Sequence, residues 1–425
     1  MDYIPKRGFQ AFARSSWIAV FFCLSYSIPS HLIAREITVC PECKVSKISQ
    51  ALDLSRDGDS ILLGKGLYRE GGLIISKKIG IRGVPGSIVD GNKEKHVFDV
   101  RSDGVSILGL KIVGSGISDI TEYAGIHAED VRGCRFEENT FEDTAYAVYL
   151  ANVDGCSILE NTAIGNAYNE VSGGNGIHLW SSKNVLIHGN KIRKHRDGIY
   201  LEFSSGLKIE DNVSEYNIRY GMHFMFSSDN DFRGNEFSNN SAGVAVMYSK
   251  NILVENNKFV NNWGDGAYGL LLKEISDGIF VKNEFYGNTV AIFSDGCNRN
   301  YFTHNRIGNN GWGIRILGNS DSNTFAKNDF RDNVFDVSTN AKTTSNRFLQ
   351  NYWDRYKGYD LDRDTFGDTP YKPVHFFGYW VAEYPFLMIL YESPVVLFLQ
   401  GLEKAFPIVT PLDFEDATPS MREIL

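Results

Sequence analysis

Residues 198–259 read GIYLEFSSGLKIEDNVSEYNIRYGMHFMFSSDNDFRGNEFSNNSAGVAVMYSKNILVENNKF, which is nearly three copies of one unit. In each copy a glycine opens a short alternating strand, a polar turn follows, and an Asn precedes an outgoing apolar residue. Successive gaps between these Asn residues are 22, 29, 22, 23, 22, 26, 22, 23 and 18 residues, at Asn139, Asn161, Asn190, Asn212, Asn235, Asn257, Asn283, Asn305, Asn328 and Asn346. A period near 22 with strand-type alternation is typical of a solenoid whose neighbouring coils bury each other's apolar side chains.

Two apolar columns accompany the Asn column. Three residues before each Asn stand Phe136, Ile158, Ile187, Ile209, Phe232, Val254, Phe280, Phe302 and Phe325. Two residues after it stand Phe141, Ile192, Phe237, Phe259, Phe285, Ile307 and Phe330, with Ala163 and Ser214 as exceptions. Equivalent residues of a parallel β-helix lie one strand spacing apart, about 4.8 Å, which suits aromatic stacks. We therefore predict an all-β fold, a right-handed parallel β-helix of about 22 residues per coil with these columns inside.

The Asn column itself is interpreted as structural. Asn tolerates unusual backbone dihedrals at a corner, and stacked side-chain amides pair along the axis. We expect a hydrogen-bonded ladder with no catalytic role.

The N-terminus resembles a secretory signal. Lys6, Arg7 and Arg14 precede an uncharged run over residues 15–33, and Ala34 is a plausible cleavage residue; a retained membrane anchor is the alternative. Because this segment carries three positive charges and one negative charge, its removal takes the net charge of the chain from −9 to −11. Such an acidic surface argues against nucleic acid and against a basic membrane-binding face, and we predict a periplasmic protein.

Export permits disulfides among the six cysteines. Cys40 and Cys43 form a CPEC motif, either a redox or metal pair or a local disulfide near the mature N-terminus. Cys134 and Cys156 both lie five residues before a ladder Asn, so they should lie one coil apart, within disulfide range or as a buried column of free thiols. Cys297 has no evident partner.

The pattern divides the chain into a signal peptide (1–34), a β-helix (35–350) and a C-terminal cap with a partner-docking tail (351–425). A capping helix over residues 46–54 should cover the first coil and block edge pairing. The two enlarged gaps hold residues 165–176 and 261–269. Both insertions come just before a strand-opening glycine, so both loops should leave the same edge.

An acidic loop follows the repeats. Asp360, Asp362 and Asp364 alternate as in a calcium loop, but Thr365 stands where that motif requires Gly, and no Glu closes it. Calcium binding and a turn-rich structural cap both remain open.

Candidate chemistry lies on the outer face of the opening strands. Two and four places after each opening glycine come the outward pairs His178 and Trp180, Tyr200 and Glu202, His223 and Met225, Ala245 and Met247, and Leu271 and Lys273. Met225 and Met247 on adjacent coils, beside His223, place soft ligands within roughly 5 to 7 Å of one another. Thioether plus imidazole suits Cu(I), so we predict a Cu(I) site with His178 and Glu202 nearby.

Other interpretations of this face remain. Met, Trp and Tyr are common at interfaces, so the face is alternatively an apolar patch against which a loop or partner packs. The HRDG stretch (residues 195–198), Tyr200 and Glu202 offer a base, a cation and a phenol, which keeps open a polysaccharide-binding or polysaccharide-modifying β-helix. The paired carboxylates of glycoside hydrolysis are missing, however, and a structural or adhesive solenoid is the third alternative. We predict that the protein is not an enzyme.

The strings NGIHLW, HRDGIYLEF, RYGMHFMFS, AGVAVMYS, AYGLLLKEISD and NYWDRYKGYDLDRD resemble the NosD family across nearly the whole mature chain. The resemblance implies a periplasmic right-handed β-helix that helps to mature nitrous oxide reductase. It also implies an ABC transporter of the NosF and NosY type and a NosL-type copper lipoprotein as partners, with copper or a copper–sulfide cluster as cargo. It assigns no ligands, and neither the CPEC motif nor Thr365 maps to a family role.

The tail carries the apolar runs YPFLMILY and PVVLFLQ, which are too short to span a bilayer and too apolar to lie bare in water. Packing on the last coil competes with burial against another protein, and we predict the latter, with contact to the membrane only through a membrane-embedded partner. The predicted docking residues are Tyr384, Phe386, Leu387, Leu390, Leu397, Phe398 and Phe406.

Overall fold

The computed structural model describes residues 34–118, 120–169, 173–341, 343–391, 393–405 and 414–425. Residues 35–425 form one compact unit. The predicted signal peptide lies, except for Ala34, outside the described residues.

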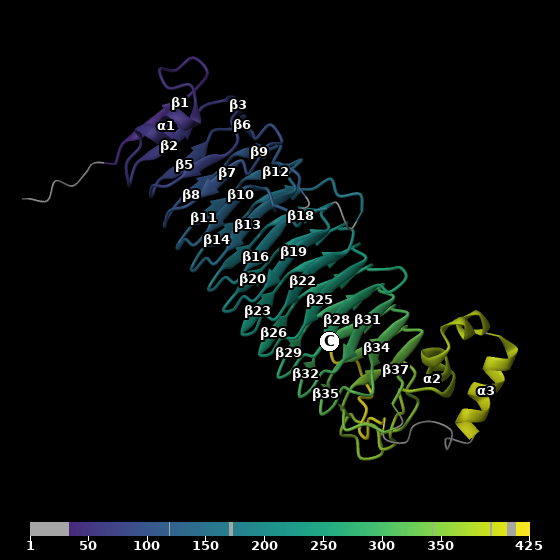
Figure 1. Ribbon diagram of the computed structural model, residues 1–425. Helices are drawn as coiled ribbons and strands as arrows, with labels where there is room; N and C mark the ends of the chain where they lie inside the picture. The colour runs from purple at the N-terminus through teal and green to yellow at the C-terminus, as the bar shows by residue number, and fades with distance from the viewer. Residues whose placement is uncertain (1–33, 119, 170–172, 342, 392, 406–413) are drawn as a thin grey trace, which may run out of the picture. The chain divides into compact units, whose positions relative to one another are not determined.

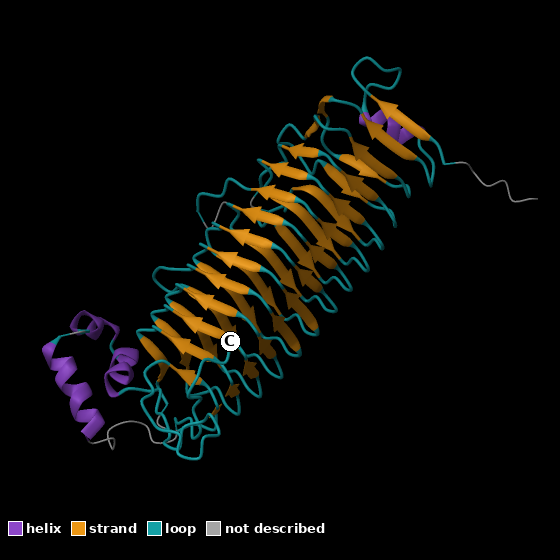
Figure 2. Ribbon diagram, turned by 180° about the vertical axis from the view of Figure 1, so that it is seen from behind, coloured by secondary structure: helices purple, strands orange, loops and turns teal. Residues whose placement is uncertain are grey.

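The compact unit is a right-handed parallel β-helix of about 23 residues per coil, as predicted (Figures 1 and 2). Three parallel sheets run along it, which we name sheets A, B and C. Sheet A has 14 strands: β1 (Glu36–Val39), β2 (Ser60–Leu63), β5 (Gly80–Gly83), β8 (Ser106–Leu108), β11 (Arg135–Glu137), β14 (Ser157–Leu159), β17 (Leu186–His188), β20 (Lys208–Glu210), β23 (Asn230–Arg233), β26 (Ile252–Glu255), β29 (Ile279–Val281), β32 (Tyr301–Thr303), β35 (Thr324–Ala326) and β38 (Arg347–Leu349).

Sheets B and C complete each coil. Sheet B has 13 strands: β3 (Gly66–Arg69), β6 (Ser87–Asp90), β9 (Lys111–Val113), β12 (Thr140–Glu142), β15 (Thr162–Ile164), β18 (Lys191–Arg193), β21 (Val213–Glu215), β24 (Glu236–Ser238), β27 (Lys258–Val260), β30 (Glu284–Tyr286), β33 (Arg306–Gly308), β36 (Asp329–Arg331) and β39 (Tyr352–Trp353). Sheet C, which contains the opening strands, has 12: β4 (Leu73–Ile75), β7 (Phe98–Val100), β10 (Ala124–Glu129), β13 (Tyr146–Ala151), β16 (Ile177–Trp180), β19 (Asp197–Glu202), β22 (Tyr220–Met225), β25 (Ala242–Met247), β28 (Tyr268–Lys273), β31 (Val290–Asp295), β34 (Trp312–Ile316) and β37 (Phe335–Thr339).

The two predicted apolar columns lie in the core. Every member is buried, the most exposed being Val254 at 4%. Phe280, Phe302 and Phe325 stack with ring centroids 4.4 and 4.6 Å apart, and Phe259 stacks on Phe285 at 4.6 Å. Register follows from this packing, because a slip by one residue would turn every aromatic ring to the solvent side.

The predicted Asn ladder exists, with one correction. From Asn139 to Asn328 each side-chain Nδ2 donates to the Oδ1 of the next Asn, over 2.9–3.2 Å. Asn346 was wrongly included: Asn328 donates to Asn351, and Asn346 belongs to a second ladder with Asn300 and Asn323. The spacing explains the error, since the 18-residue gap to Asn346 is too short for a coil whereas Asn351 lies one full coil on. A third ladder, missed in the sequence, joins Asn217, Asn240, Asn262, Asn288, Asn310 and Asn333.

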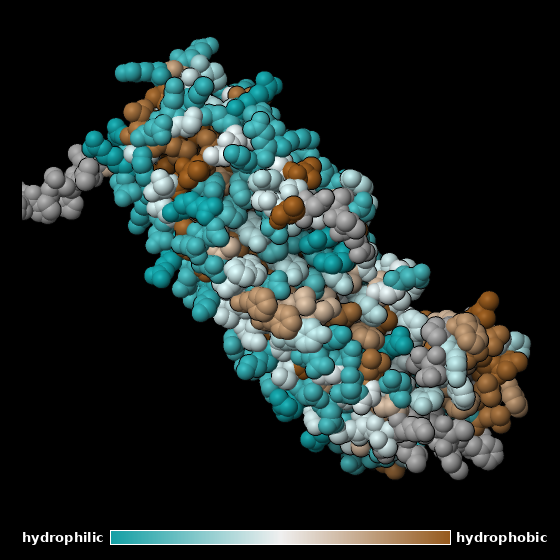
Figure 3. All heavy atoms as spheres, in the orientation of Figure 1, coloured by the Kyte–Doolittle hydropathy of each residue, from teal (hydrophilic) through white to brown (hydrophobic). Residues whose placement is uncertain are grey.

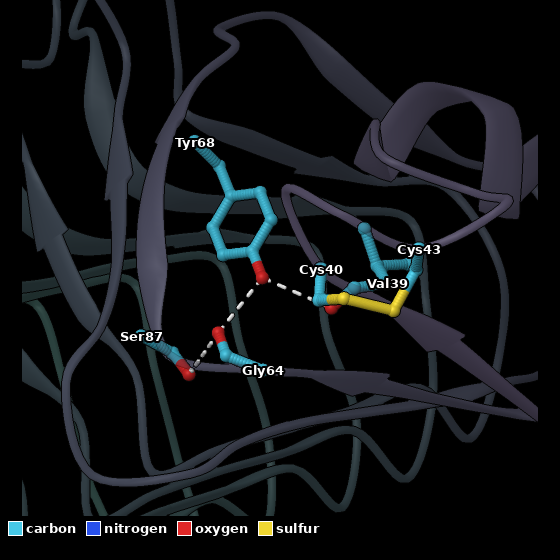
Figure 4. Close-up of a disulfide and its surroundings, with 6 residues drawn as sticks. All are labelled: Val39, Cys40, Cys43, Gly64, Tyr68 and Ser87. Carbon is cyan, nitrogen blue, oxygen red and sulfur yellow. Dashed lines mark hydrogen bonds between the residues drawn. A yellow bond between two sulfur atoms is a disulfide. The ribbon is translucent and has the colours of Figure 1, made fainter.

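A helix and a disulfide close the N-terminal end. Helix α1 (Ile48–Leu54) forms within the predicted residues, and Glu70 accepts hydrogen bonds from the backbone N–H groups of its first residues. Cys40 and Cys43 form a disulfide beside the Tyr68 hydroxyl, which donates to the Val39 and Gly64 carbonyls (Figure 4). The CPEC motif is therefore a local staple.

The other predicted cysteine pair is also a disulfide. Cys134 and Cys156 are bonded, with Cα atoms 4.5 Å apart on adjacent coils. Cys297 is a free, buried thiol, and burial raises its pKa. Both predicted insertions leave the same edge, because each connects a strand of sheet B to the next strand of sheet C.

The C-terminal part begins with helices α2 (Phe376–Glu383), 3₁₀ helix η1 (Pro385–Leu390) and α3 (Pro394–Ala405). We call these three the helical segment. Residues 414–425 then return to the last coil: Asp416 bridges to Phe348 and Ser420 bridges to Tyr352. The final residues therefore cap the β-helix.

Candidate functional site

The outward face of sheet C carries a continuous column of imidazole and phenol rings. Parallel pairing places one residue per coil in this column, in the order His127, Tyr149, His178, Tyr200 and His223, followed by Ala245, Leu271, Phe293 and Arg315. His96 stacks on His127 with ring centroids 4.2 Å apart, and the following ring pairs lie 4.5 to 5.5 Å apart. We call these six residues, from His96 to His223, the ring column.

The imidazoles of the ring column point outward yet are largely covered. His127, His178 and His223 are 9%, 8% and 7% exposed. Tyr146 contacts His178 and Tyr220 contacts His223 edge-on or at a tilt, which accounts for part of the cover. The outward direction was predicted correctly, but periodicity alone does not reveal this shielding.

Burial keeps two of these imidazoles neutral. Desolvation lowers the pKa of His96 to about 4 and that of His178 to about 3. Desolvation also raises the pKa of Tyr200 to about 12, so its phenol stays protonated. Neutral imidazole is the form that binds a metal ion.

Two histidines of the column face carboxylates, of which Asp197 is buried and Asp99 is partly exposed. His127 Nδ1 lies 2.9 Å from an Asp99 carboxylate oxygen, and Arg101 binds the same carboxylate. His223 Nδ1 lies 3.7 Å from Asp197, which Arg219 binds through two nitrogen atoms. At both histidines an Asp bound by an Arg therefore lies near Nδ1, at hydrogen-bonding distance from His127 and further from His223.

The predicted thioether pair is adjacent. Met225 pairs with Met247 across β22 and β25, and Glu202 precedes Met225 in the same column. All three side chains are partly exposed. His223 lies on the same face of β22 as Met225, two residues away, so the structure brings four of the five predicted site residues onto three adjacent coils.

His178, the fifth, lies one coil further toward the N-terminus and opens into a groove. The groove has a volume of about 460 Å³ and is lined by His96, Thr121, Glu122, His127, Glu129, Tyr149, Ala151, His178, Trp180 and Glu202. Three of these residues, His96, His127 and Tyr149, were not predicted from the sequence. For His127 a signal existed, since it follows Gly125 by two residues as His178 follows Gly176, in a coil before the clearest repeats.

An exposed aromatic stack borders the methionines. Phe203, Phe226 and Tyr248 directly follow Glu202, Met225 and Met247, and their rings are parallel at 5.3 and 5.0 Å. All three have φ between 50° and 55°, a left-handed conformation that bulky residues rarely adopt. Earlier coils have Asn152 and Ser181 at this position, so the apolar stack is confined to the coils that carry Glu202 and the two methionines.

The acidic loop forms a different cluster from the predicted one. Ligand oxygens of Asp360, Asp362 and Asp368 lie within 4.8 Å of one another. The Asp364 carboxylate instead accepts the Phe366 backbone N–H. Within the described ranges this is the only group of three His, Cys, Asp or Glu side chains whose ligand atoms lie so close together. Calcium binding by this loop stays a prediction.

The helical segment packs one side on the β-helix and exposes the other. Phe377, Val381 and Val396 form a buried cluster with Phe335 of β37, and Leu387 packs against it. Of the other predicted docking residues, Phe406 lies outside the described ranges, and Tyr384, Phe386, Leu390, Leu397 and Phe398 are exposed. Figure 3 shows the resulting apolar surface at the helical segment. Among the described residues, no helix is both long and apolar enough to cross a lipid bilayer.

Comparison with known proteins identifies similar chains. The family model described as "Periplasmic copper-binding protein (NosD)" matches residues 168–366. The protein from Pseudomonas aeruginosa named "Probable ABC transporter binding protein NosD" is 29% identical over 392 residues, covering 87% of this chain and 90% of that one. A protein of the same name from Stutzerimonas stutzeri is 27% identical over 393 residues, covering 87% and 89%.

Solved structures support the fold alone. The Dettilon tailspike protein (gp208) aligns with a TM-score of 0.55 at 16% identity, over 70% of this chain and 65% of that one. A hyperthermoactive exopolygalacturonase from Thermotoga maritima aligns with a TM-score of 0.50 at 10% identity, over 66% and 81%.

Proposed function

The chain belongs to the NosD family, and we propose on that basis that it binds Cu(I) in the periplasm and assists the maturation of nitrous oxide reductase together with an ABC transporter. Its role is that of an accessory protein, and copper, or a copper–sulfide cluster, is its cargo.

The observation that carries the copper assignment is the donor set of β22 and β25. Met225 and Met247 are in register, and His223 on the same face has two ring nitrogens with no hydrogen-bond partner among the described residues. A buried polar atom without a partner is costly unless a ligand satisfies it. Thioether and imidazole donors together favour Cu(I) over harder ions.

Competition for Cu(I) against a chromogenic chelator under reducing conditions tests this site. The Met225→Ala, Met247→Ala double variant should bind Cu(I) at least about tenfold more weakly, because only imidazole and carboxylate donors remain. Met421→Ala, which removes a thioether elsewhere, is the control and should bind like the parent. Equal affinity in all three proteins would reject the copper site.

The partners are proposed to be a NosF- and NosY-type transporter, a NosL-type copper lipoprotein and the reductase. Transfer of Cu(I) between proteins requires the donor to approach the acceptor ligands closely. The exposed stack of Phe203, Phe226 and Tyr248 next to the methionines supports such a contact, since exposed aromatic residues are enriched at interfaces. The apolar surface of the helical segment supports docking on the transporter.

The groove favours a second candidate function, the binding of a polysaccharide. Tyr149 and Trp180 offer aromatic surface for a sugar ring, and Glu122, Glu129 and Glu202 offer hydrogen-bond acceptors. Because these carboxylates repel uronates, neutral hexose oligosaccharides should bind in preference. Calorimetric titration with both classes tests this candidate, and absence of heat with either class would reject it.

A further inference from the structure

Asp197 is a wholly buried carboxylate at the start of β19, on the coil before His223. Arg219 Nε donates to its Oδ1 over 2.8 Å, and Arg219 Nη2 donates to its Oδ2. Arg196 Nε lies 3.9 Å from the same Oδ2. The carboxylate is therefore held in place from two sides.

The charge of Asp197 survives this burial. The Arg219 guanidinium binds both carboxylate oxygens and the Arg196 side chain lies near one of them, and two neighbouring positive charges favour the ionised carboxylate. An ionised carboxylate only accepts hydrogen bonds. Whatever faces its remaining lone pairs must therefore present a proton.

His223 is the group that faces it. Its Nδ1 lies 3.7 Å from Asp197 Oδ2, close enough for charge attraction though too long for a hydrogen bond. Its Nε2 has no hydrogen-bond partner among the described residues, and the rings of Tyr200 and Tyr220 lie 5.1 and 4.8 Å from the imidazole between centroids. Asp197 Oδ2 thus places a negative charge beside Nδ1, and the Arg219 guanidinium is bound to the same oxygen.

We propose that Asp197 is a positioning residue for the copper site: it holds the proton of His223 on Nδ1 and so leaves the Nε2 lone pair to bind the metal ion. The proposal rests on the proposed function, and it adds the residue that fixes the tautomer of the imidazole ligand. Metal-binding histidines commonly donate their second N–H to a carboxylate in this way.

A second Asp bound by an Arg lies near a histidine of the ring column, in a different geometry: Asp99 is in register with His127, whereas Asp197 is in register with Tyr220. His127 Nδ1 lies 2.9 Å from Asp99, with Arg101 on the carboxylate. Asp99 lies in β7 and has no methionine on the adjacent coils of its column. Asp99 and His127 therefore offer a control, an Asp and His pair with no thioether nearby in its column.

The tautomer of His223 in the metal-free chain tests the proposal directly. Nitrogen-15 NMR of histidine-labelled protein should show Nδ1–H at His223 in the parent. The Asp197→Asn variant should lose this preference, whereas Asp99→Asn should change the His127 signal and leave His223 unaltered. Finding Nε2–H at His223 in the parent would overturn the proposal, and this measurement needs no variant to fold.

Cu(I) affinity supplies the second readout. Asp197→Asn should weaken binding about 10- to 100-fold, the usual effect of losing such an outer partner. In a His223→Gln background the same substitution should have no further effect, because Asp197 acts through the imidazole. An equal loss with and without His223 would mean a general structural role and would also overturn the proposal.

These outcomes separate the inference from the function on which it rests. If the double methionine variant keeps full Cu(I) affinity, the copper site fails whatever the tautomer is. If that variant loses affinity while Asp197→Asn retains it, the copper site stands and Asp197 has no part in it.

Discussion

Phe280 lies within the aromatic stack of sheet A and is completely buried. Its ring is parallel to that of Phe302 at 4.4 Å, and it pairs with Val254 on the preceding coil. Truncation there leaves a cavity that neighbouring coils cannot close, because their own hydrogen bonds fix the coil spacing.

Phe280→Ala should therefore destabilise the chain by about 3–5 kcal/mol. The measurement is the urea midpoint followed by circular dichroism. Tyr301→Ala, on the next coil of the same sheet but 43% exposed, is the control and should shift the midpoint far less. Equal shifts for both variants would mean that the stack contributes no more than a surface residue does.

At the scale of the element, the helical segment divides into an inner and an outer side. Phe377 and Val381 hold it to Phe335, while Phe386, Ile389 and Phe398 are 72%, 88% and 65% exposed. Exposed apolar surface of this extent marks an interaction site. Point variants suit its study better than truncation, because residues 414–425 cap the last coil.

Replacing Phe386, Ile389 and Phe398 together by Ser should abolish co-purification with the transporter permease in detergent. Thermal unfolding and soluble Cu(I) binding should stay as in the parent, since these side chains contribute little to the fold. A control variant with Ile74, Tyr286 and Leu361 changed to Ser alters other exposed apolar residues elsewhere and should keep the permease. Retention of the permease by the first variant would reject docking through this surface.

The whole molecule should lose stability in acid through its buried histidines. Desolvation lowers the pKa of His195, which is 1% exposed, from 6.5 to about 4. As the pH falls below 6.5 the unfolded chain takes up a proton that the folded chain refuses, so stability is lost between pH 6.5 and about 4. His96 and His178 act in the same direction.

His195→Gln should make this loss shallower, by at most about 1.4 kcal/mol per pH unit in that window. Urea midpoints at several pH values measure the slope. Comparison with the parent cancels the opposite contribution of Asp336, whose pKa desolvation raises to about 6. An unaltered slope in His195→Gln would contradict this prediction.

A structural feature can be predicted from this sequence when it repeats from coil to coil. Phe232 and Phe280 recur at a fixed distance from an Asn, so core, register and coil number follow from one alignment. Met225 and Met247 follow from strand phase for the same reason. The contact of Asp197 with His223 depends on the arginine that binds the carboxylate, and the cap by Asp416 joins residues 65 positions apart. Such contacts have no period, and a pattern in the sequence does not reveal them.

The Asn ladder has a direction. From Asn139 onward each side-chain amide donates one N–H toward the C-terminal end, to the next Asn and finally to Asp416, so ten side-chain hydrogen bonds run in one direction and polarise one another. The second N–H of each amide donates to a backbone carbonyl of the preceding coil, as from Asn161 to Phe136. The last amide of such a row needs a group that accepts hydrogen bonds and donates none. Asp416 is that group: its carboxylate receives Asn351 Nδ2, the backbone N–H groups of Gln350 and Asn351, and the Trp353 indole N–H. The carboxylate of Asp416 thus lies at the positive end of the row, as an acidic residue lies at the N-terminus of an α-helix. An Asn at position 416 would add an N–H donor where the neighbouring groups are all donors.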